Sequence, residues 1–448
     1  MRDTKRRMEF FSFYDHTGIS AHLERMAERG WLLEKIGTLT WHYRRIEPKK
    51  LAFSVCYFAK ASMYDPRPSA EQNMFYDLCA HTGWTLAASS GQMQVFYNER
   101  ENPVPIDTDP ALEVEAVHQS AKKGYLVSQA LLGGAAVLNI IVTLFRLYTD
   151  PIRALASPFA LFLMVCWPAL ALVIAFDTGS YFLWRRRALA AARQGEFLAT
   201  NSHPLLQRGL LAVVLAALVW MLSSLSGGIF LVIAASMACA LAALLLVSGA
   251  REAMRRKQVS AETNRMVTIA VCVAVSLLIA WGIPSLVLRG AGEASPGVLP
   301  LTMDDLMETD YDFATDFTEQ LESPLLASFG GRQSPRLHED MAAGAPSLYY
   351  SVTVVKAPLL YDLCKNHLLK QNENRDTDFL PIKYYAPTDP APWGAQEAYQ
   401  FMMGEEDEDM RLENTCLLFY PDRIVYFRPS WEPTPEQMAV VAEKLGGQ

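Results

Sequence analysis

The stretch LVSQALLGGAAVLNIIVTLFRLY, residues 126–148, carries one charged side chain, Arg146, among apolar and small residues. A helix of about 20 apolar residues spans the roughly 30 Å hydrocarbon core of a membrane. Four later runs have the same character and contain at most one charge each. They cover residues 159–184, 210–226, 229–249 and 266–288. The central part of the chain, residues 122–289, is therefore predicted to be a transmembrane domain of five helices.

A buried helical bundle of a soluble protein is the alternative interpretation of these runs. Helices of such a bundle show polar positions at the helical period, whereas these runs are apolar on all sides. The third and fourth runs are separated only by Gly227 and Gly228. One continuous helix over 210–249 would be about 60 Å long, twice the hydrocarbon thickness. A tight hairpin is therefore predicted at the two glycines.

The basic residues that flank the runs predict the orientation, because Lys and Arg accumulate on the cytoplasmic side of a membrane. With the N-terminus inside, the outer margins hold Arg146, Arg153 and Arg289. The inner margins hold Lys122, Lys123, Arg185, Arg186, Arg187, Arg193, Arg208, Arg251, Arg255, Arg256, Lys257 and Arg265. We therefore expect a multi-pass protein of the cell membrane with a cytoplasmic N-terminus and an extracytoplasmic C-terminus.

Charge divides the chain into three regions. The 448 residues are 51% apolar and 20% charged, with a formal net charge of −8, which excludes an intrinsically disordered chain. Residues 1–121 carry 14 basic and 16 acidic side chains, residues 122–289 carry 15 and 5, and residues 290–448 carry 11 and 27. Three charge balances indicate three environments. The slightly negative first region also argues against direct binding of nucleic acid.

Residues 1–121 contain a repeat. A helix that ends at Gly30 and Trp31 is followed by two strands, and the same order returns around Gly83 and Trp84. Each glycine is suited to a left-handed helix cap, after which the chain reverses and the tryptophan packs under the helix. The pattern predicts a cytoplasmic α+β module of two β-α-β-β units that share one sheet. Both tryptophans are expected in its core.

This repeat resembles a known family. Four segments carry the resemblance: LERMAERGWLLEKI at 23–36, WHYRRIEP at 41–48, the second Gly-Trp pair at 83–84 and NPVPIDTDP at 102–110. They are similar to the bacterial membrane-linked domain-of-unknown-function family 2812 over about the first 110 residues. The resemblance implies a cytoplasmic α+β module fused to membrane helices, found mainly in Gram-positive bacteria. It also implies transcriptional regulators resembling the phenolic-acid repressor type as gene neighbours, and no catalytic residue.

Residues 290–448 are predicted to form an acidic extracytoplasmic α+β domain. Strands are expected at 348–356, 416–420 and 424–428, and helices at 359–370 and 393–402. The stretch 330–346 is rich in Gly, Pro, Ser and Ala, which predicts a loop. The last helix has the clearest start, since Thr434 as N-cap, Pro435 at the first position and Gln437 at the third predict a capping box.

Two cysteines of this domain, Cys364 and Cys416, lie on elements that are expected to meet. An oxidising exterior would allow them to form a disulfide. Two buried thiols on adjacent elements are the alternative, since the sequence pattern is the same in both cases.

No motif for common enzyme chemistry is present. The sequence lacks a Gly-rich phosphate loop, HExxH, CxxC and GxSxG. We therefore predict no enzymatic activity, no cofactor and no metal site. Asp177 is the only acidic residue inside a predicted span, and a carboxylate within a membrane is a functional candidate.

Two functions are consistent with this organisation. The first is a regulatory or sensory membrane protein that couples an extracytoplasmic domain to a cytoplasmic interaction module, and it is favoured because both soluble regions lack catalytic motifs. The second is a transporter component or membrane enzyme that uses Asp177. The expected partners are the lipid bilayer and, from the family resemblance, a cytoplasmic transcriptional regulator. No feature of the sequence sets an oligomeric state.

Overall fold

The structure is a computed structural model that describes residues 3–37, 40–200, 204–223, 227–274, 299–317, 320–336, 344–371, 373–374, 381–404 and 411–447. The chain divides into two compact units. The first consists of Met1–Leu138, Trp167–Ala216 and Gly227–Gly292, and the second of Asn139–Cys166, Ala217–Ser226 and Glu293–Gln448. Each unit is therefore assembled from segments that lie far apart in the sequence.

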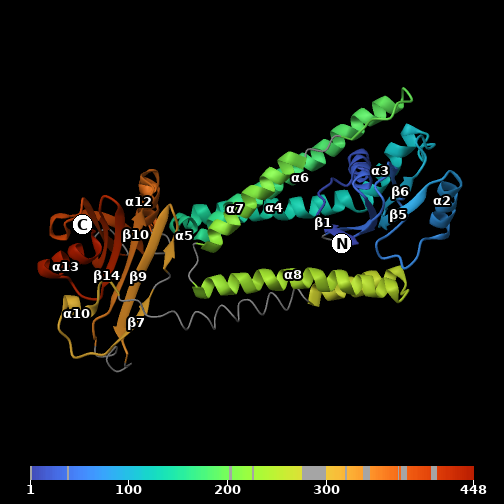
Figure 1. The fold of residues 1–448 in the computed structure, drawn as a ribbon. Coiled ribbons are helices and arrows are strands. Elements are labelled where there is room, and N and C mark those ends of the chain that lie inside the picture. The colour runs from blue at the N-terminus through green and yellow to red at the C-terminus, as the bar shows by residue number, and fades with distance from the viewer. Residues whose placement is uncertain are drawn as a thin grey trace. The chain divides into compact units, whose positions relative to one another are not determined.

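The N-terminal module of the first unit contains the repeat (Figure 1). Its first copy consists of β1 (Thr4–Arg7), α1 (His16–Glu28), β2 (Trp31–Ile36) and β3 (Trp41–Arg45). Its second copy consists of β4 (Ala52–Tyr57), α2 (Ala70–His81), β5 (Thr85–Ser90) and β6 (Met93–Asn98). Both copies form antiparallel sheets with the same strand order, β1-β3-β2 and β4-β6-β5.

The two copies form two three-stranded sheets rather than the one sheet expected. Strands β2 and β5 lie next to each other where the copies meet. Each carries a β-bulge, between Leu33 and Lys35 in β2 and between Leu86 and Ala88 in β5. A bulge interrupts the regular ladder of hydrogen bonds and increases the local twist. The two facing strands are therefore poorly suited to pairing with each other.

A series of helices follows the module. They are α3 (Pro110–Lys123), α4 (Tyr125–Thr149), α5 (Pro151–Ala156), α6 (Pro158–Ala192), α7 (Pro204–Ser223) and α8 (Gly227–Arg256). Asp109 caps α3 by accepting hydrogen bonds from the N–H groups of Ala111 and Leu112, at 2.8 and 3.4 Å. Residues 261–274 are also helical.

The fold class expected from the sequence, with a five-helix transmembrane domain at its centre, is wrong. Among the described residues, two helices, α4 and α6, are long and apolar enough to cross a membrane, and Gly209–Ser223 is a shorter apolar helix. Most of the expected span 266–288 lies outside the described residues. The fold is mixed α/β, with β-rich parts at both ends of the chain.

The exposed surfaces of α4 and α6 are apolar. The side chains of Leu131 and Tyr148 on α4 are 71% and 84% exposed, and large apolar side chains of α6 are exposed in the same way. A soluble protein rarely leaves so many apolar side chains in contact with water. The two helices therefore suggest an association with a membrane.

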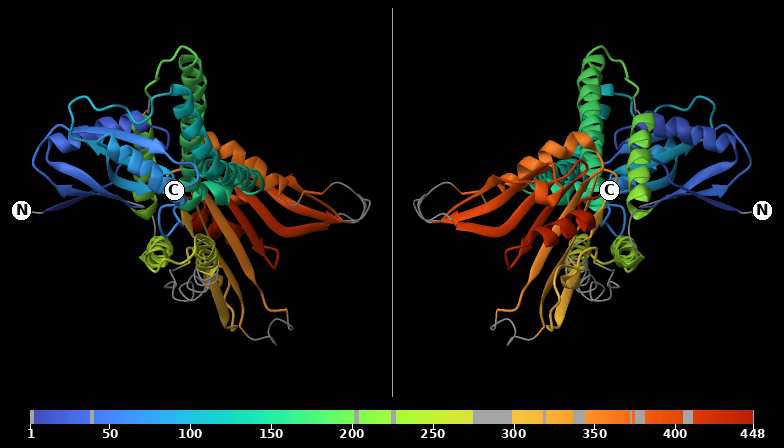
Figure 2. Two further views of the ribbon diagram at one scale, coloured as in Figure 1. Left: turned by 90° about the vertical axis from the view of Figure 1, so that its right-hand side faces the viewer. Right: turned by 90° about the vertical axis from the view of Figure 1, so that its left-hand side faces the viewer.

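The C-terminal domain of the second unit is built on an eight-stranded antiparallel sheet (Figure 1, Figure 2). Its strands are β7 (Phe313–Phe317), β8 (Leu321–Glu322), β9 (Leu326–Pro335), β10 (Leu348–Val355), β11 (Ile382–Thr388), β12 (Glu397–Gly404), β13 (Arg411–Phe419) and β14 (Arg423–Pro429). The order is β11-β12-β13-β14-β10-β9-β7, and β8 pairs with β9. Its helices are α10 (Met303–Leu306), η2 (Pro358–Leu360), α12 (Tyr361–Lys370), η3 (Ala391–Trp393) and α13 (Pro435–Leu445).

Both faces of this sheet are covered, and alternate residues of the central strands supply the two cores. Leu418 and Val425 contribute to a core that also contains residues of α10, η3 and α13. Their neighbours Phe419 and Ile424 contribute to a second core on the opposite face. This second core contains Leu155 and other residues of α5, together with residues of α12. The short helix between α4 and α6 is therefore part of the C-terminal domain.

Candidate functional site, a buried polar junction around Asp177

Asp177 lies in α6, and both of its carboxylate oxygens accept hydrogen bonds. Tyr125 and Gln129 of α4 donate to Oδ2, at 2.7 and 3.1 Å. Ser12, from the loop between β1 and α1, donates to Oδ1. The carboxylate is therefore satisfied by three donors from two separate segments, as a buried polar group requires. These bonds fasten the N-terminal module to the first turns of α4 and to the later part of α6.

Aromatic side chains surround this carboxylate. Tyr14, Tyr181 and Trp184 belong to the core of the module, and Tyr181 is fully buried. The ring of Phe13 stacks on that of Tyr125 with centroids 5.7 Å apart. The hydroxyl of Tyr181 lies 2.7 Å from Nδ1 of His118. Burial, together with the charge of Asp177, raises the pKa of Tyr14 to about 12, so its hydroxyl keeps its proton at neutral pH.

A second group of polar residues lies at the start of α1. Asp15 is the N-cap of α1, where Oδ1 accepts from the N–H of Gly18 at 3.1 Å and from the hydroxyl of Thr200 at 2.6 Å. Nε2 of His16 is 2.7 Å from Oε1 of Glu113 on α3. Thr200 follows α6, so the second group also connects the module to this helix.

The pKa of His16 is raised by its partner. Burial is the largest single influence, and it lowers this pKa. The hydrogen bond to Glu113 and the charge of Glu113 raise it, as do the carbonyl of Tyr14 and the charge of Asp15, and together they outweigh burial. The net result is a pKa above the ordinary histidine value. The charged imidazolium is therefore the form that fits the folded module better.

The stability of the module is expected to decrease as the pH rises above neutrality. Because the pKa of His16 is higher in the folded module than in the unfolded chain, where it is about 6.5, folding is favoured by protonation. This contribution is complete below about pH 6.5 and is lost as the pH rises through the raised pKa. Thermal denaturation of the full chain in detergent between pH 6 and pH 9 measures it.

His16→Gln should remove this part of the pH dependence. The matched control is His81→Gln, because His81 is an exposed histidine of α2. If both variants retain the pH dependence of the parent chain, another group is responsible for it.

The four residues of the Gly-Trp pairs occupy equivalent places in the two copies. Gly30 has φ +79° and Gly83 has φ +91°, both in the left-handed region that favours glycine. Trp84 is 4% exposed and donates from Nε1 to the carbonyl of Val104 at 2.8 Å. Trp31 is only partly buried, and the charged groups of two basic side chains lie over its ring.

The other singled-out residues of the C-terminal domain are structural. Thr434 caps α13 by accepting from the N–H of Gln437, the Gln437 side chain accepts from the N–H of Thr434 in return, and Pro435 occupies the first helical position. Cys364 on α12 and Cys416 on β13 are both buried free thiols. Burial raises the pKa of each thiol, to about 11 and about 12 respectively.

The basic residues that predicted the orientation are distributed unequally between the two units. All twelve inner-margin positions fall within the first unit: Lys122, Lys123, Arg185, Arg186, Arg187, Arg193, Arg208, Arg251, Arg255, Arg256, Lys257 and Arg265. Arg146 and Arg153 belong to the second unit, and Arg289 lies outside the described residues. At the end of α8, Nε of Arg255 donates to the carbonyl of Asp65 at 3.2 Å, so this end contacts the module.

The sequence singled out Asp177 but not the residues that bind it. Ser12 precedes it by 165 positions, and no periodic pattern relates the two. His16, Glu113 and Thr200 were missed for the same reason. The only available signal was a run of polar and aromatic residues before α1. Across the ranges that the structure describes, no group of three or more His, Cys, Asp or Glu is arranged to hold a metal ion.

The N-terminal module, which contributes residues to this junction, matches the model of one protein family. Residues 16–128 match the family model DUF2812, described as a protein of unknown function. The match covers most of the repeat, α3 and the first residues of α4. It identifies no catalytic family. Neither a curated protein nor a solved structure matches the chain.

Proposed function

We propose that this chain is a membrane protein that transmits a signal between an extracytoplasmic C-terminal domain and a cytoplasmic DUF2812 module. The observation that carries the proposal is that α4 and α6 each contribute side chains to two hydrophobic cores. At one end they place Tyr125, Tyr181 and Trp184 in the core of the module. At the other end they contribute Leu147 and Leu161 to the surroundings of the core beneath the C-terminal sheet. A displacement of either helix would therefore disturb both cores.

The proposed sides of the membrane follow from these contacts. If α4 and α6 cross the bilayer, α5 lies on one side and the module on the other. Because α5 belongs to the C-terminal domain, this domain lies on the same side as α5, whatever the path of the chain between them. The concentration of basic residues in the first unit favours the cytoplasm for the module. A cytoplasmic transcriptional regulator is the partner that we propose for it.

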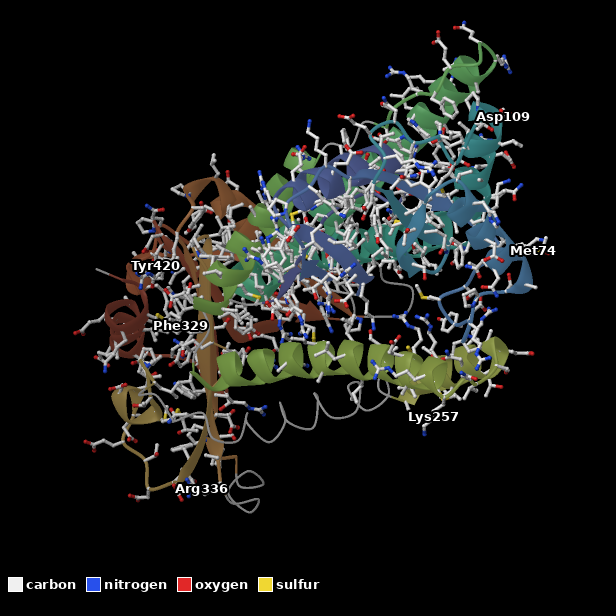
Figure 3. The ribbon with its side chains drawn as sticks, turned by 45° about the vertical axis from the view of Figure 1, so that its right-hand side comes forward. Met74, Asp109, Lys257, Phe329, Arg336 and Tyr420 are labelled. Atoms are coloured by element: carbon white, nitrogen blue, oxygen red, sulfur yellow. The ribbon has the colours of Figure 1, made fainter. Side chains whose placement is uncertain are left out.

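Impermeant maleimide labelling of single cysteines is expected to reach the C-terminal domain, but not the module, in intact cells. Leu359 is 97% exposed and Met74 on α2, labelled in Figure 3, is 70% exposed, so cysteine at either position is accessible to reagent. Leu359→Cys should be labelled in intact cells and Met74→Cys only after lysis. The parent chain should carry Cys272→Ser, because Cys272 is an exposed thiol. Labelling in the reverse pattern would refute the proposed orientation.

Coupling itself can be measured by hydrogen exchange on the full chain in lipid nanodiscs. Leu155 of α5 is 8% exposed, and Leu155→Asp should displace α5 from the sheet. We expect faster exchange of the amides of α3 and of the part of α6 around Tyr181. Leu359→Asp is the matched control, since it places the same charge at an exposed position. Unchanged exchange in the first unit, with clear changes in the C-terminal domain, would contradict the proposal.

The junction supports coupling better than a transport or enzymatic role for Asp177. Both carboxylate oxygens are engaged by groups of the protein itself. A carboxylate in this setting holds segments together, and it is well placed to respond when they move.

A further inference from the structure

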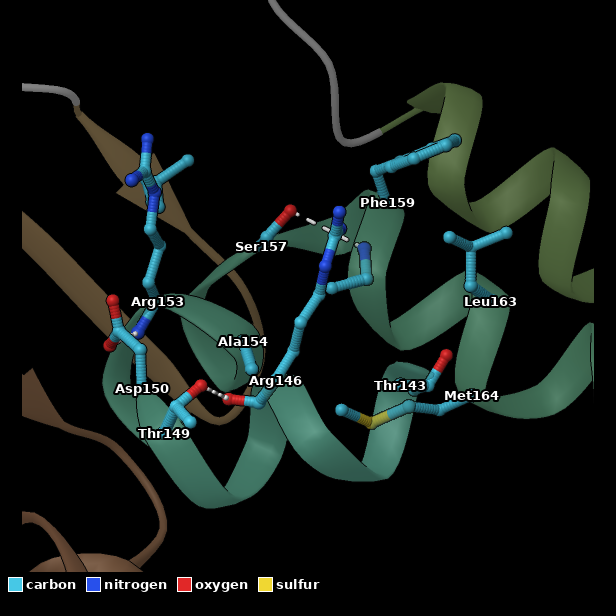
Figure 4. Close-up of a pocket in the computed structure, with 12 residues that line it drawn as sticks. Thr143, Arg146, Thr149, Asp150, Arg153, Ala154, Ser157, Phe159, Leu163 and Met164 are labelled. Carbon is cyan, nitrogen blue, oxygen red and sulfur yellow. Dashed lines mark hydrogen bonds between the residues drawn. The ribbon is translucent and has the colours of Figure 1, made fainter. Parts of the chain in front are cut away.

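The second unit contains a cavity of about 510 Å³ where the end of α4, the helix α5 and the start of α6 meet β8 (Figure 4). Its polar side includes two guanidinium groups, from Arg146 and Arg153, and one carboxylate, from Asp150. Its apolar side includes Phe159, Leu163 and Met164 of α6. The cavity is therefore polar at one side and apolar at the other.

Local hydrogen bonds engage several polar groups of the cavity lining. The carboxylate of Asp150 caps α5 by accepting from the N–H of Arg153 at 3.0 Å. The hydroxyl of Thr149 donates to the carbonyl of Phe145 at 3.0 Å, and that of Ser157 accepts from the N–H of Ala160 at 3.3 Å. These side chains are therefore occupied in forming the turns around the cavity.

Arg146 gives the cavity its positive character. Figure 4 shows its side chain extending past Ser157 toward Phe159. Within the described ranges, no ion pair joins its guanidinium to an acidic side chain. The first turn of α6 also borders the cavity, and the N-terminus of a helix favours an anion.

We infer that this cavity binds the phosphodiester head group of an anionic phospholipid, with an acyl chain lying along the apolar wall. Guanidinium groups form charge-assisted hydrogen bonds to phosphate oxygens. Phe159 is 45% exposed and begins the apolar surface of α6, so an acyl chain can continue from the cavity along this helix. The inference rests on the proposed function, because it requires this end of α4 and α6 to lie at the membrane surface. A lipid there would contact α5 and both helices that reach the module.

Native mass spectrometry of the delipidated full chain in detergent tests this inference. Phosphatidylglycerol should bind at one saturable site, and phosphatidylcholine should bind more weakly. Arg146→Gln should reduce the affinity for phosphatidylglycerol about tenfold, since a charge-assisted contact is lost. Arg146→Lys should retain part of it. Arg336→Gln is the matched control, because Arg336 at the end of β9 (Figure 3) is exposed and does not line the cavity.

Two binding results would overturn the inference. Equal binding of both lipids without an effect of Arg146→Gln would mean unspecific lipid contact. Inorganic phosphate that displaces the lipid at similar concentration would mean a site for the free anion. Circular dichroism shows whether the Arg146 variants keep their fold. If Arg146→Lys and Arg146→Gln both lose the fold, Phe159→Ala is tested in their place, and this variant should bind phosphatidylglycerol more weakly than the parent chain. Alkaline carbonate distinguishes the two proposals. If carbonate extracts the chain from membranes, the proposed function is refuted. If the chain stays in the membrane but binds no phosphatidylglycerol, only the lipid site is refuted.

Discussion

Replacing Asp177 with alanine is expected to destabilise the N-terminal module by about 3 to 5 kcal/mol, because it leaves several buried donors without an acceptor. Ser12, Tyr125 and Gln129 all donate to this carboxylate, and the first two hydrogen bonds are buried. Native-state hydrogen exchange measures the effect as the opening free energy of the amides of α1 and α3. The full chain in detergent is the appropriate sample, since α4 and α6 complete the core of the module.

Two further variants identify the cause of this effect. Asp177→Asn keeps one acceptor oxygen and should cost about 1 to 2 kcal/mol. Glu196→Ala removes an exposed carboxylate that lies beyond the end of α6 and should change the opening free energy by less than about 0.5 kcal/mol. If Asp177→Ala is as stable as the parent chain, the junction does not hold the module to the helices, and the proposed coupling loses its main support.

The position of Asp177 illustrates what the sequence could not show about α6. The run 159–184 is apolar except for a few polar residues such as Asp177, and this pattern predicts a membrane span. In the structure, Tyr181 and Trp184 near its end are buried in the core of the module. Hydropathy records the polarity of side chains and not what covers them, so a lipid-facing turn and a turn within a protein core give the same signal. The boundary between the two cannot be read from composition.

Two segments of the C-terminal domain show that local sequence patterns also failed to predict strands. The glycine-rich stretch 330–346 predicted a loop, but β9 extends to Pro335. A Cβ atom on Gly331 would lie 2.6 Å from Cδ2 of Leu299, so this glycine permits close packing over the strand. The stretch 393–402 predicted a helix, but it contains most of β12. There the sheet provides hydrogen-bond partners on both edges, from β11 and β13, which overrides the local preference.

Local signals were more informative where they act within a few residues. The start of α13 depends on Thr434, Pro435 and Gln437 alone, and its capping box is present in the structure. The left-handed glycines Gly30 and Gly83 are likewise set by the helix ends that precede them. Within the polar junction, Ser12 and Asp177 lie 165 positions apart, and Asp15 and Thr200 lie 185 apart, and one sequence contains no comparable signal for such contacts.

Trp84→Ala is expected to destabilise the second copy of the repeat by about 3 to 5 kcal/mol, and Trp31→Ala the first copy by only about 1 to 2 kcal/mol. Trp84 packs in a buried cluster with Cys79 and Phe96, and its loss leaves a cavity and an unpaired carbonyl at Val104. Trp31 is half-buried at the equivalent position, so its removal exposes less apolar surface. Hydrogen exchange of the amides of β6 and β3 measures the two copies separately within the same chain.

The pair of substitutions is its own control, since both remove the same side chain from the same position of the repeat. Trp84→Phe should recover part of the stability, because a ring still fills part of the space between Cys79 and Phe96. Equal losses in the two copies would mean that Trp31 contributes as a core residue in spite of its exposure. A larger loss for Trp31→Ala would point to its cationic neighbours, Lys5 and Arg45, whose charged groups lie 5.1 and 5.7 Å from the ring centroid. The expected order follows from burial, because the free energy lost on truncation increases with the volume left unfilled.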